Sequence, residues 1–194
     1  MNLSPMTLQH RLAAACVALV CAFAATPLAQ RGGYLLFTDP SRRYAVEFPR
    51  DWKWTVVAGA GEALATFVHP KAEAAIVVER FRMKQSLAQD EITDIFAQVE
   101  ADVLKENQPR VMDVNARVVV QGQRRLVQID YRRPGVGEPG KVEDERVRQY
   151  SFPVKGNLYR ITCAALQGQF GKYEATFQWV AESLKSAEEL PPTK

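Results

Sequence analysis

Two kinds of apolar repeat divide the chain into segments that resemble strands and segments that resemble helices. In the first kind, apolar and polar residues alternate, which is typical of a β-strand with one buried face. Tyr44, Val46 and Phe48 share one such face before Pro49 ends the pattern. The pattern predicts strands at residues 34–38, 44–49, 54–58, 62–69, 74–83, 110–121, 124–132, 142–154 and 158–165.

The second kind of repeat occurs at residues 88–107 and 170–184, where apolar side chains return every three or four positions. This spacing predicts two amphipathic helices, the first with Ser86 as its N-cap. The apolar face of the first helix is expected to contain Ile92, Ile95, Phe96, Val99 and Val103. The stripe of the second helix, which must dock on the sheet, is expected to contain Phe170, Tyr173, Phe177, Val180 and Leu184.

Short glycine-bearing connections separate several of the predicted strands, at Gly59–Gly61, Gly122 and Gly156. Connections of two to five residues join antiparallel neighbours, since parallel strands need a much longer crossover. A longer loop is expected at residues 134–140. The order of elements therefore predicts an α+β fold built on an antiparallel sheet of about six or seven strands.

The N-terminal segment has a different character, because Arg11 precedes fourteen consecutive apolar residues at 12–25 and a small-residue exit. These are the parts of a secretory signal peptide, and the apolar run is shorter than the ~20 residues that span a bilayer as a helix. We expect a signal peptide at residues 1–29, with cleavage after Ala24 or Ala29, and an exported protein that is periplasmic or extracellular. No later segment is apolar enough to predict a membrane span.

Residues 30–187 are expected to form a single domain, followed by a flexible tail at 188–194. Cleavage would remove Cys16 and Cys21 and leave Cys163 as a lone thiol, so no internal disulfide is predicted. The remaining 24 basic and 22 acidic residues nearly balance. This near-neutral charge argues against a dedicated nucleic-acid-binding protein.

Few residues of the predicted domain suggest reaction chemistry. Cys163 lies among apolar residues of one predicted strand, where a cysteine acts as a small hydrophobe, and His69 is the only histidine beyond the leader. A single histidine cannot build a zinc site, and the adjacent acids of residues 143–145 would alternate between two faces of a strand. We therefore predict no catalytic residues, no metal and no cofactor.

Three residues are candidates for contact with a partner. Trp54 is one of two tryptophans that flank Lys53, and aromatic anchors are frequent in interfaces. Arg132 and Arg133 form a basic pair that could bind a partner, although such pairs are more often solvated strand ends.

Several motifs of the chain resemble the PsbP-like proteins, which are named for an extrinsic subunit of the photosynthetic oxygen-evolving complex. The motifs are residues 44–52 (YAVEFPRDW), 149–152 (QYSF), 155–162 (KGNLYRIT) and the closing helix around Phe177, Val180 and Leu184. The resemblance extends over residues 34–186. It implies an α-β-α arrangement, with the sheet flanked by helices, and docking to partner proteins or assistance in their assembly. The resemblance supplies no catalytic residues to this sequence.

The function that these observations predict is that of a non-enzymatic, exported binding or assembly-accessory domain whose partner is a protein of the cell envelope. One alternative is a carrier that holds a small apolar ligand in a cleft lined by Phe96, Phe170 and Phe177. A third hypothesis is a hydrolase, which would need two buried carboxylates facing one pocket.

Overall fold

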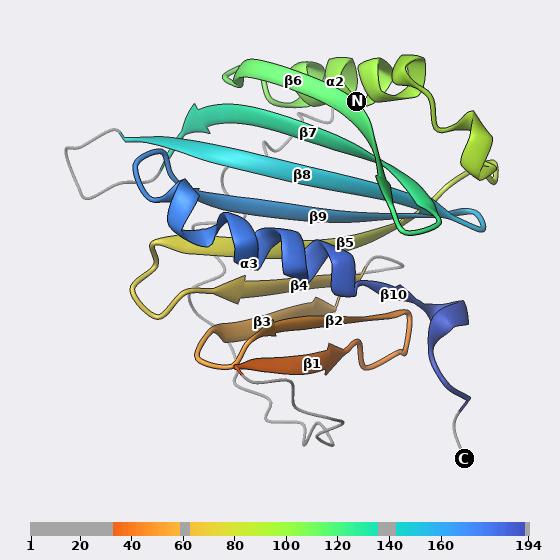
Figure 1. Cartoon of the computed structure of the whole chain (residues 1–194), viewed down its shortest axis with the longest axis horizontal. Helices are drawn as coiled ribbons and strands as arrows, with labels where there is room; N and C mark the ends of the chain where they lie inside the picture. Colours follow the sequence, from red (N-terminus) through yellow and green to blue (C-terminus); the bar gives the residue numbers. More distant parts are fainter. Residues whose placement is uncertain (1–32, 59–62, 136–142, 193–194) are drawn as a thin grey trace, which may run out of the picture.

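A seven-stranded antiparallel sheet forms the middle of the computed structural model, which describes residues 33–58, 63–135 and 143–192 (Figure 1). The strand order in this sheet is β3-β4-β5-β9-β8-β7-β6. Its strands are β3 (Lys53–Ala58), β4 (Ala63–Val68), β5 (Ala74–Arg82), β6 (Met112–Gln121), β7 (Arg124–Pro134), β8 (Asp144–Val154) and β9 (Asn157–Leu166). Both ends of each of the nine predicted strands lie within two residues of the ends of an observed strand.

A second, three-stranded sheet lies beside the first and contains β1 (Tyr34–Thr38), β2 (Tyr44–Pro49) and β10 (Lys185–Ser186). Strand β2 is in the middle and pairs antiparallel with both neighbours. The turn between β1 and β2 is held by Asp39, whose carboxylate accepts hydrogen bonds from the backbone of Ser41 and from the backbone and guanidinium of Arg43. An aspartate that caps its own turn in this way stabilises a tight reversal.

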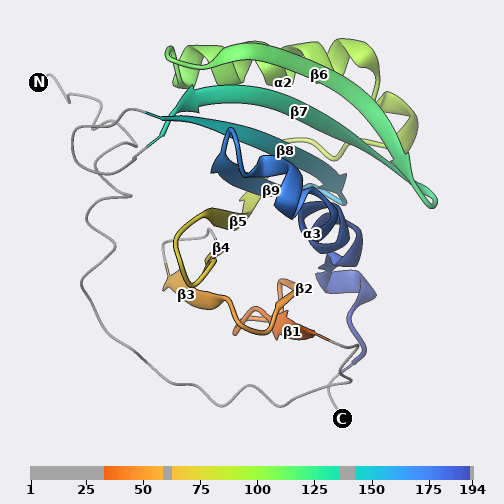
Figure 2. The same cartoon turned by 60° about the vertical axis from the view of Figure 1, so that its left-hand side comes forward.

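Two α-helices cover opposite faces of the large sheet. The sheet curves so that α3 (Phe170–Ser183) lies inside the curve and α2 (Asp94–Asn107) lies outside it (Figure 2). A short 3-10 helix, η1 (Gln89–Glu91), precedes α2, and another, η2 (Ala187–Glu189), follows β10. The predicted α+β fold with an antiparallel sheet flanked by helices is therefore confirmed.

The pleat of the central strands directs their side chains into two separate cores, one on each face of the sheet. On β7, Val127, Ile129 and Tyr131 pack beneath α2, while Leu126 points to the core that contains α3. The core on the α3 side also includes side chains from β2, β4, β5, β8 and β9. Alternate residues of a strand point to opposite faces, so one strand can serve both cores.

The second predicted helix is confirmed, with Phe170, Tyr173, Phe177, Val180 and Leu184 all buried. The five side chains form one stripe against the sheet. Large aromatic side chains dominate it, and such side chains bury the most apolar area per residue.

The first predicted helix differs from its prediction in two ways. It begins at Asp94, and its N-cap is Thr93, whose hydroxyl accepts a hydrogen bond from the backbone N–H of Phe96, so Ser86 as N-cap was wrong. Its buried residues are Ala97, Ala101 and Leu104, whereas Ile95, Val99 and Val103 are exposed, so the predicted apolar face was also wrong. Only Ile92, ahead of the helix, and the partly buried Phe96 contribute to the core as predicted.

Some predictions concern residues outside the described ranges, namely the signal peptide at 1–29, the glycine turn at 59–61 and most of the loop at 134–140. Of the predicted tail, residues 188 and 189 belong to η2, where Glu189 pairs with Arg124 of the β6–β7 hairpin. Among the described helices, none is both long enough and apolar enough to cross a membrane.

We expect Phe177→Ala to lower the free energy of unfolding by about 3–5 kcal/mol, because the ring is fully buried and its removal leaves a cavity. Ile95→Ala should change it by less than about 0.5 kcal/mol, because this side chain is 78% exposed. Urea denaturation monitored by circular dichroism measures both values. A large loss for Ile95→Ala would mean that its side chain is buried in solution.

Candidate interaction surface

The lone thiol of the described chain lies in the core and is not placed for catalysis. Cys163 is fully buried on β9, on the same face as Ile161 and opposite Ile76 of β5. Burial raises the pKa of the Cys163 thiol above its usual range. A nucleophilic cysteine requires the opposite shift, so this residue acts as a small apolar side chain.

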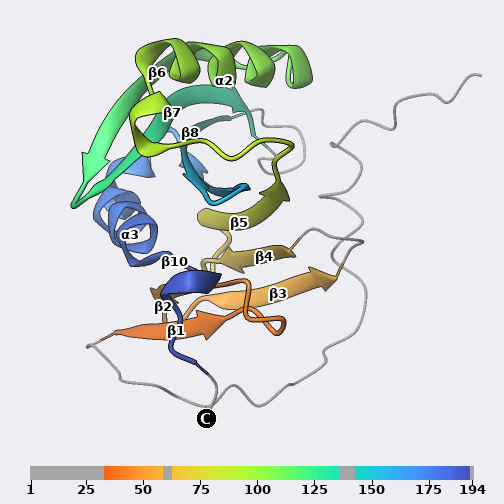
Figure 3. The same cartoon turned by 90° about the vertical axis from the view of Figure 1, so that its right-hand side faces the viewer.

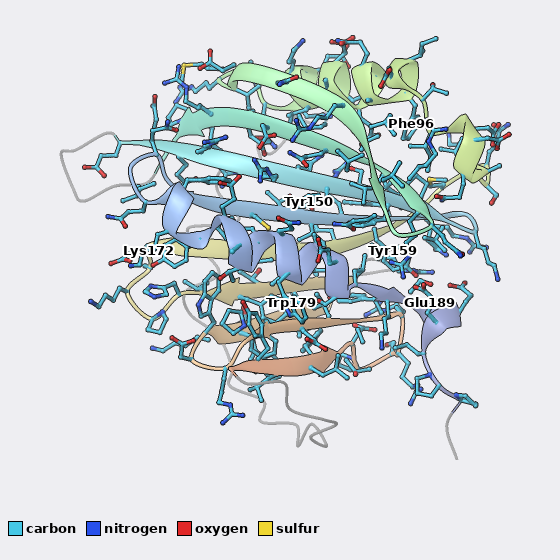
Figure 4. All side chains as sticks on the ribbon, viewed as in Figure 1. Phe96, Tyr150, Tyr159, Lys172, Trp179 and Glu189 are labelled. Carbon is cyan, nitrogen blue, oxygen red and sulfur yellow. The ribbon has the colours of Figure 1, made fainter. Side chains whose placement is uncertain are left out.

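His69 belongs to a cluster that ties the β4–β5 turn to the start of α3. Its Nδ1 accepts a hydrogen bond from the backbone N–H of Lys71 and lies 4.0 Å from Oε2 of Glu73, too far for a hydrogen bond. The same Glu73 oxygen accepts hydrogen bonds from Lys172 Nζ at 2.8 Å and from Tyr173 Oη at 2.6 Å. Trp52 completes the cluster, with ring centroids 5.8 Å from His69 and 6.0 Å from Tyr173. Lys172 is labelled in Figure 4.

The ionic contacts of Glu73 change its acidity. Hydrogen bonds from Lys172 and then from Tyr173 lower the pKa of Glu73 to about 2. A carboxylate that stays ionised and donor-bound is a poor proton donor at neutral pH. The cluster therefore acts as an anchor for α3, not as an acid–base pair.

A second polar group ties the sheet to the outer flank of α3. The guanidinium of Arg148 on β8 donates to Asp130 on β7 at 2.6 Å and to Glu174 on α3 at 2.7 Å, and it lies 5.5 Å from the centre of the Phe170 ring. Burial alone would lower the pKa of Arg148, but the hydrogen bond and charge of Asp130, together with Glu174, raise it. All three charged groups are therefore engaged in holding the helix in place.

The hydrolase hypothesis needs two buried carboxylates at one pocket, and the described ranges do not place such a pair. Asp39 is the one buried carboxylate among the described residues, and Arg43 and its own turn occupy its oxygens. In the same part of the chain, no three His, Cys, Asp or Glu side chains are close enough to hold a metal ion.

The three aromatic residues of the ligand-carrier hypothesis do not line one cleft. Phe170 and Phe177 are buried in the core on the α3 side with ring centroids 5.3 Å apart, while Phe96 belongs to α2 and packs against the core on the other face of the sheet. A hollow of about 550 Å³ is present elsewhere, at the β6–β7 turn. It is lined by Val120, Gln121, Gly122, Gln123, Arg124 and Glu182. This lining is mostly polar, unlike a site for an apolar ligand.

The structure does not bring the predicted partner-binding residues together. Trp54 is on β3, an edge strand, where it is 39% exposed and its ring lies 5.4 Å from that of Phe37. Arg132 and Arg133 are on β7, which is separated from β3 by four other strands of the sheet. Arg132 pairs with Asp113 and Asp144, and Arg133 pairs with Glu145. Consecutive residues of a strand point to opposite faces, so the two arginines do not share a surface.

Exposed apolar side chains occur instead on the outward side of α2, the helix that is uppermost in Figure 3. Ile95, Val99 and Val103 are 78%, 52% and 41% exposed. Their spacing of four residues places them in one row along the helix, opposite the buried row of Ala97, Ala101 and Leu104. We call Ile95, Val99 and Val103 the α2 ridge. Isolated exposed apolar side chains are ordinary, whereas exposed apolar side chains gathered in one patch are typical of interaction surfaces.

Acidic side chains accompany the α2 ridge. Residues 89–107 contain six carboxylates and one basic residue, Lys105, in a chain whose net charge is +3. Lys105 and Gln98 both donate to Asp102. Among the carboxylates, Glu100 points to the sheet and contacts Ser151 and Arg160, while the others are exposed. The outward side of α2 therefore combines an apolar row with a negative surround.

Sequence reasoning missed this surface because α2 carries two apolar rows. The larger side chains, Ile95, Val99 and Val103, suggested the buried face, but the smaller row of Ala97, Ala101 and Leu104 faces the sheet. Alanines on the inner side allow the helix backbone to come close to the strands. The row of Ala97, Ala101 and Leu104, with spacings of four and three, is visible in the sequence and was the signal that could have indicated the buried face.

Comparison with known proteins gives a consistent fold. A family model described as PsbP matches residues 32–186. Cyanobacterial PsbP (CyanoP) from Synechocystis sp. PCC 6803 is 15% identical, with a TM-score of 0.61 over 84% of this chain and 98% of that chain. The Ran-binding protein Mog1p of Saccharomyces cerevisiae is 8% identical, with a TM-score of 0.53 over 79% of this chain and 95% of that chain. No curated protein sequence matches significantly.

We expect the native full-length chain and its Cys163→Ala variant to react with the same number of equivalents of a thiol reagent, because the buried Cys163 thiol is unreactive. In denaturant, the wild-type chain should react with one equivalent more than the variant. The absorbance of the thiolate that the reagent releases measures the number of equivalents consumed, in native protein and in denaturant. A native wild-type chain that already consumes the extra equivalent would show that Cys163 is accessible.

We expect Glu73→Gln to destabilise the fold near neutral pH and to have a progressively smaller effect on acidification. The pKa of Glu73 is lowered from 4.5 to about 2, so its stabilisation is complete above the unfolded pKa and is lost as the pH falls through the folded one. Thermal unfolding of both proteins between pH 6 and pH 2 measures the difference. A difference that does not change with pH would contradict the ionic role of Glu73.

Proposed function

The chain belongs to the PsbP family, and from this premise we propose that it is a non-catalytic accessory domain that binds a partner protein through the α2 ridge. The observation that carries the proposal is the row of Ile95, Val99 and Val103, exposed on a helix whose other side is packed on the sheet. A rigid scaffold that presents an apolar row needs no reactive group to bind a protein. The yeast protein Mog1p, which has a similar fold, is described as a Ran-binding protein.

The structural roles of the side chains that could react support a binding role. Cys163 is in the core, and Glu73, Asp130 and Glu174 accept hydrogen bonds that position α3. In this proposal these groups keep the sheet and α3 rigid, so that α2 presents its outer side in a constant position. Such preorganisation reduces the entropy that association would otherwise cost.

We propose that the domain works outside the cytoplasm, bound to a protein of the cell envelope. The charged and apolar pattern of residues 1–29 supports export. Mass spectrometry of the chain expressed in its own cells tests this step. We expect a mature N-terminus at residue 25 or 30, and recovery of the intact chain from the cytoplasm would contradict it.

We expect the double variant Ile95→Glu/Val99→Glu to lose most of its captured partner, because two charges would be buried in the contact. The matched control is Val57→Glu, which places the same side chain at a position that is 50% exposed on β3, at the far edge of the sheet. Affinity capture from the envelope fraction, with circular dichroism of each variant, measures the effect. The control should capture as much partner as the wild-type chain.

A photo-cross-linking amino acid incorporated at position 99 or at position 57 provides an independent test. Position 99 should yield a discrete cross-linked product, and position 57 should not. Equal capture by the Ile95→Glu/Val99→Glu variant and the wild-type chain, or cross-linking only at position 57, would overturn the proposal.

A further inference from the structure

We infer that the partner segment recognised by the α2 ridge is a cationic amphipathic helix, an inference that rests on the proposed function. Three features of the ridge point to this occupant. They are the spacing of the ridge side chains, the backbone groups in the interior of α2, which are already bonded within the helix, and the acidic residues around the ridge.

The geometry of the α2 ridge suits another helix. Ile95, Val99 and Val103 are spaced by four residues, and about 12 Å of helix axis separates the first from the last. A row with this spacing is the ridge that enters the groove of a second helix in the commonest class of helix packing. A partner helix with its own apolar stripe would therefore cover all three side chains at once.

An extended partner strand would find little to bind on this surface. The backbone N–H and C=O groups in the interior of α2 are bonded within the helix, so they cannot form a ladder with an added strand. Side-chain contact with the ridge is the attraction that remains. This favours a partner that presents side chains from a rigid surface, as a helix does.

The charges around the α2 ridge favour a partner that carries positive charge. Asp102 and Glu106 lie on the outward side of α2 beside the ridge, and Asp90, Glu91 and Asp94 are exposed at its N-terminal end. Lys105 is 3.2 Å from Asp102, so this pair is neutral overall, and Glu106 together with Asp90, Glu91 and Asp94 keeps the surround net negative. Lysine or arginine side chains that flank the apolar stripe of a partner would meet this field favourably, and an acidic partner would be repelled.

The same field argues against an anionic lipid surface as the occupant. Helices that lie on membranes carry lysine and arginine beside their apolar face, which attracts the negative headgroups. Residues 89–107 have the reverse arrangement, with six carboxylates and one lysine. A basic protein helix is therefore favoured over a membrane.

Two designed helical peptides of the same length and the same leucine stripe test the inference, one flanked by lysines and one by glutamates. The full-length protein should bind the lysine peptide at least about tenfold more tightly than the glutamate peptide at low salt, and raising the salt to 0.3 M should reduce this preference. Fluorescence anisotropy of labelled peptides measures both affinities. Equal affinities, or preference for the glutamate peptide, would overturn the inference.

Protein variants assign the binding to the α2 ridge and its surround. Ile95→Ser/Val99→Ser should weaken the lysine peptide about tenfold, while Val57→Ser should leave its affinity unchanged. Asp102→Asn/Glu106→Gln keeps the shape but removes two charges, so it should weaken the lysine peptide and flatten its salt dependence. An unchanged affinity for the lysine peptide in the ridge variant or in the charge variant would contradict the assignment of its binding site to the α2 ridge.

The outcomes separate this inference from the proposed function. If position 99 cross-links a native partner but neither peptide binds, the proposed function stands and the cationic helix is wrong. Binding to vesicles of anionic phospholipid that is lost in Ile95→Ser/Val99→Ser would overturn the inference in favour of a membrane. Preference for the lysine peptide that is lost in both the ridge and the charge variants supports it.

Discussion

The pleat of β7, β8 and β9 is the constraint on which the rest of the structure depends, because both faces of these strands are covered. Leu126 and Val127 are neighbours in the chain, yet they belong to different cores. A shift of one residue in the pairing would send every apolar side chain of a strand to the wrong core. The register of these strands thus determines where both helices can dock.

The helix inside the curve is held by large side chains and by polar contacts at its flank. Phe170, Tyr173 and Phe177 fill the core, and Arg148 and Glu73 connect α3 to the sheet and to the β4–β5 turn. Trp179, also on α3, donates its indole N–H to Glu47 of β2 at 3.1 Å. These contacts use ionisable side chains to hold α3 in place, so these side chains are anchors of the helix and not acid–base pairs.

The helix outside the curve is held differently, by small side chains. Ala97 and Ala101 face the sheet, and only Leu104 and the neighbouring Phe96 add bulk to that contact. The larger Ile95, Val99 and Val103 consequently face solvent with the acidic residues. A helix that retains its larger apolar row on the outside of a packed domain remains able to bury that row against another molecule.

The amino-acid sequence by itself determined the order and kind of nearly every element. Alternation and the glycine-bearing turns identified the strands. The single apolar stripe of residues 170–184 identified α3, because that helix offered one buried pattern. The sequence also indicated the antiparallel connections, through turns such as Lys155–Gly156, where both residues have positive φ. The family resemblance followed from motifs within these elements.

Only the tertiary structure decided which row of α2 is buried, because periodicity cannot rank two apolar rows on one helix. It also decided that Trp54, Arg132 and Arg133 lie on separate surfaces, since strand order places β3 and β7 far apart and the pleat separates adjacent residues. Both outcomes depend on how closely α2 approaches the sheet and on which strands become neighbours. These are contacts between distant parts of the chain, and local patterns carry no information about them.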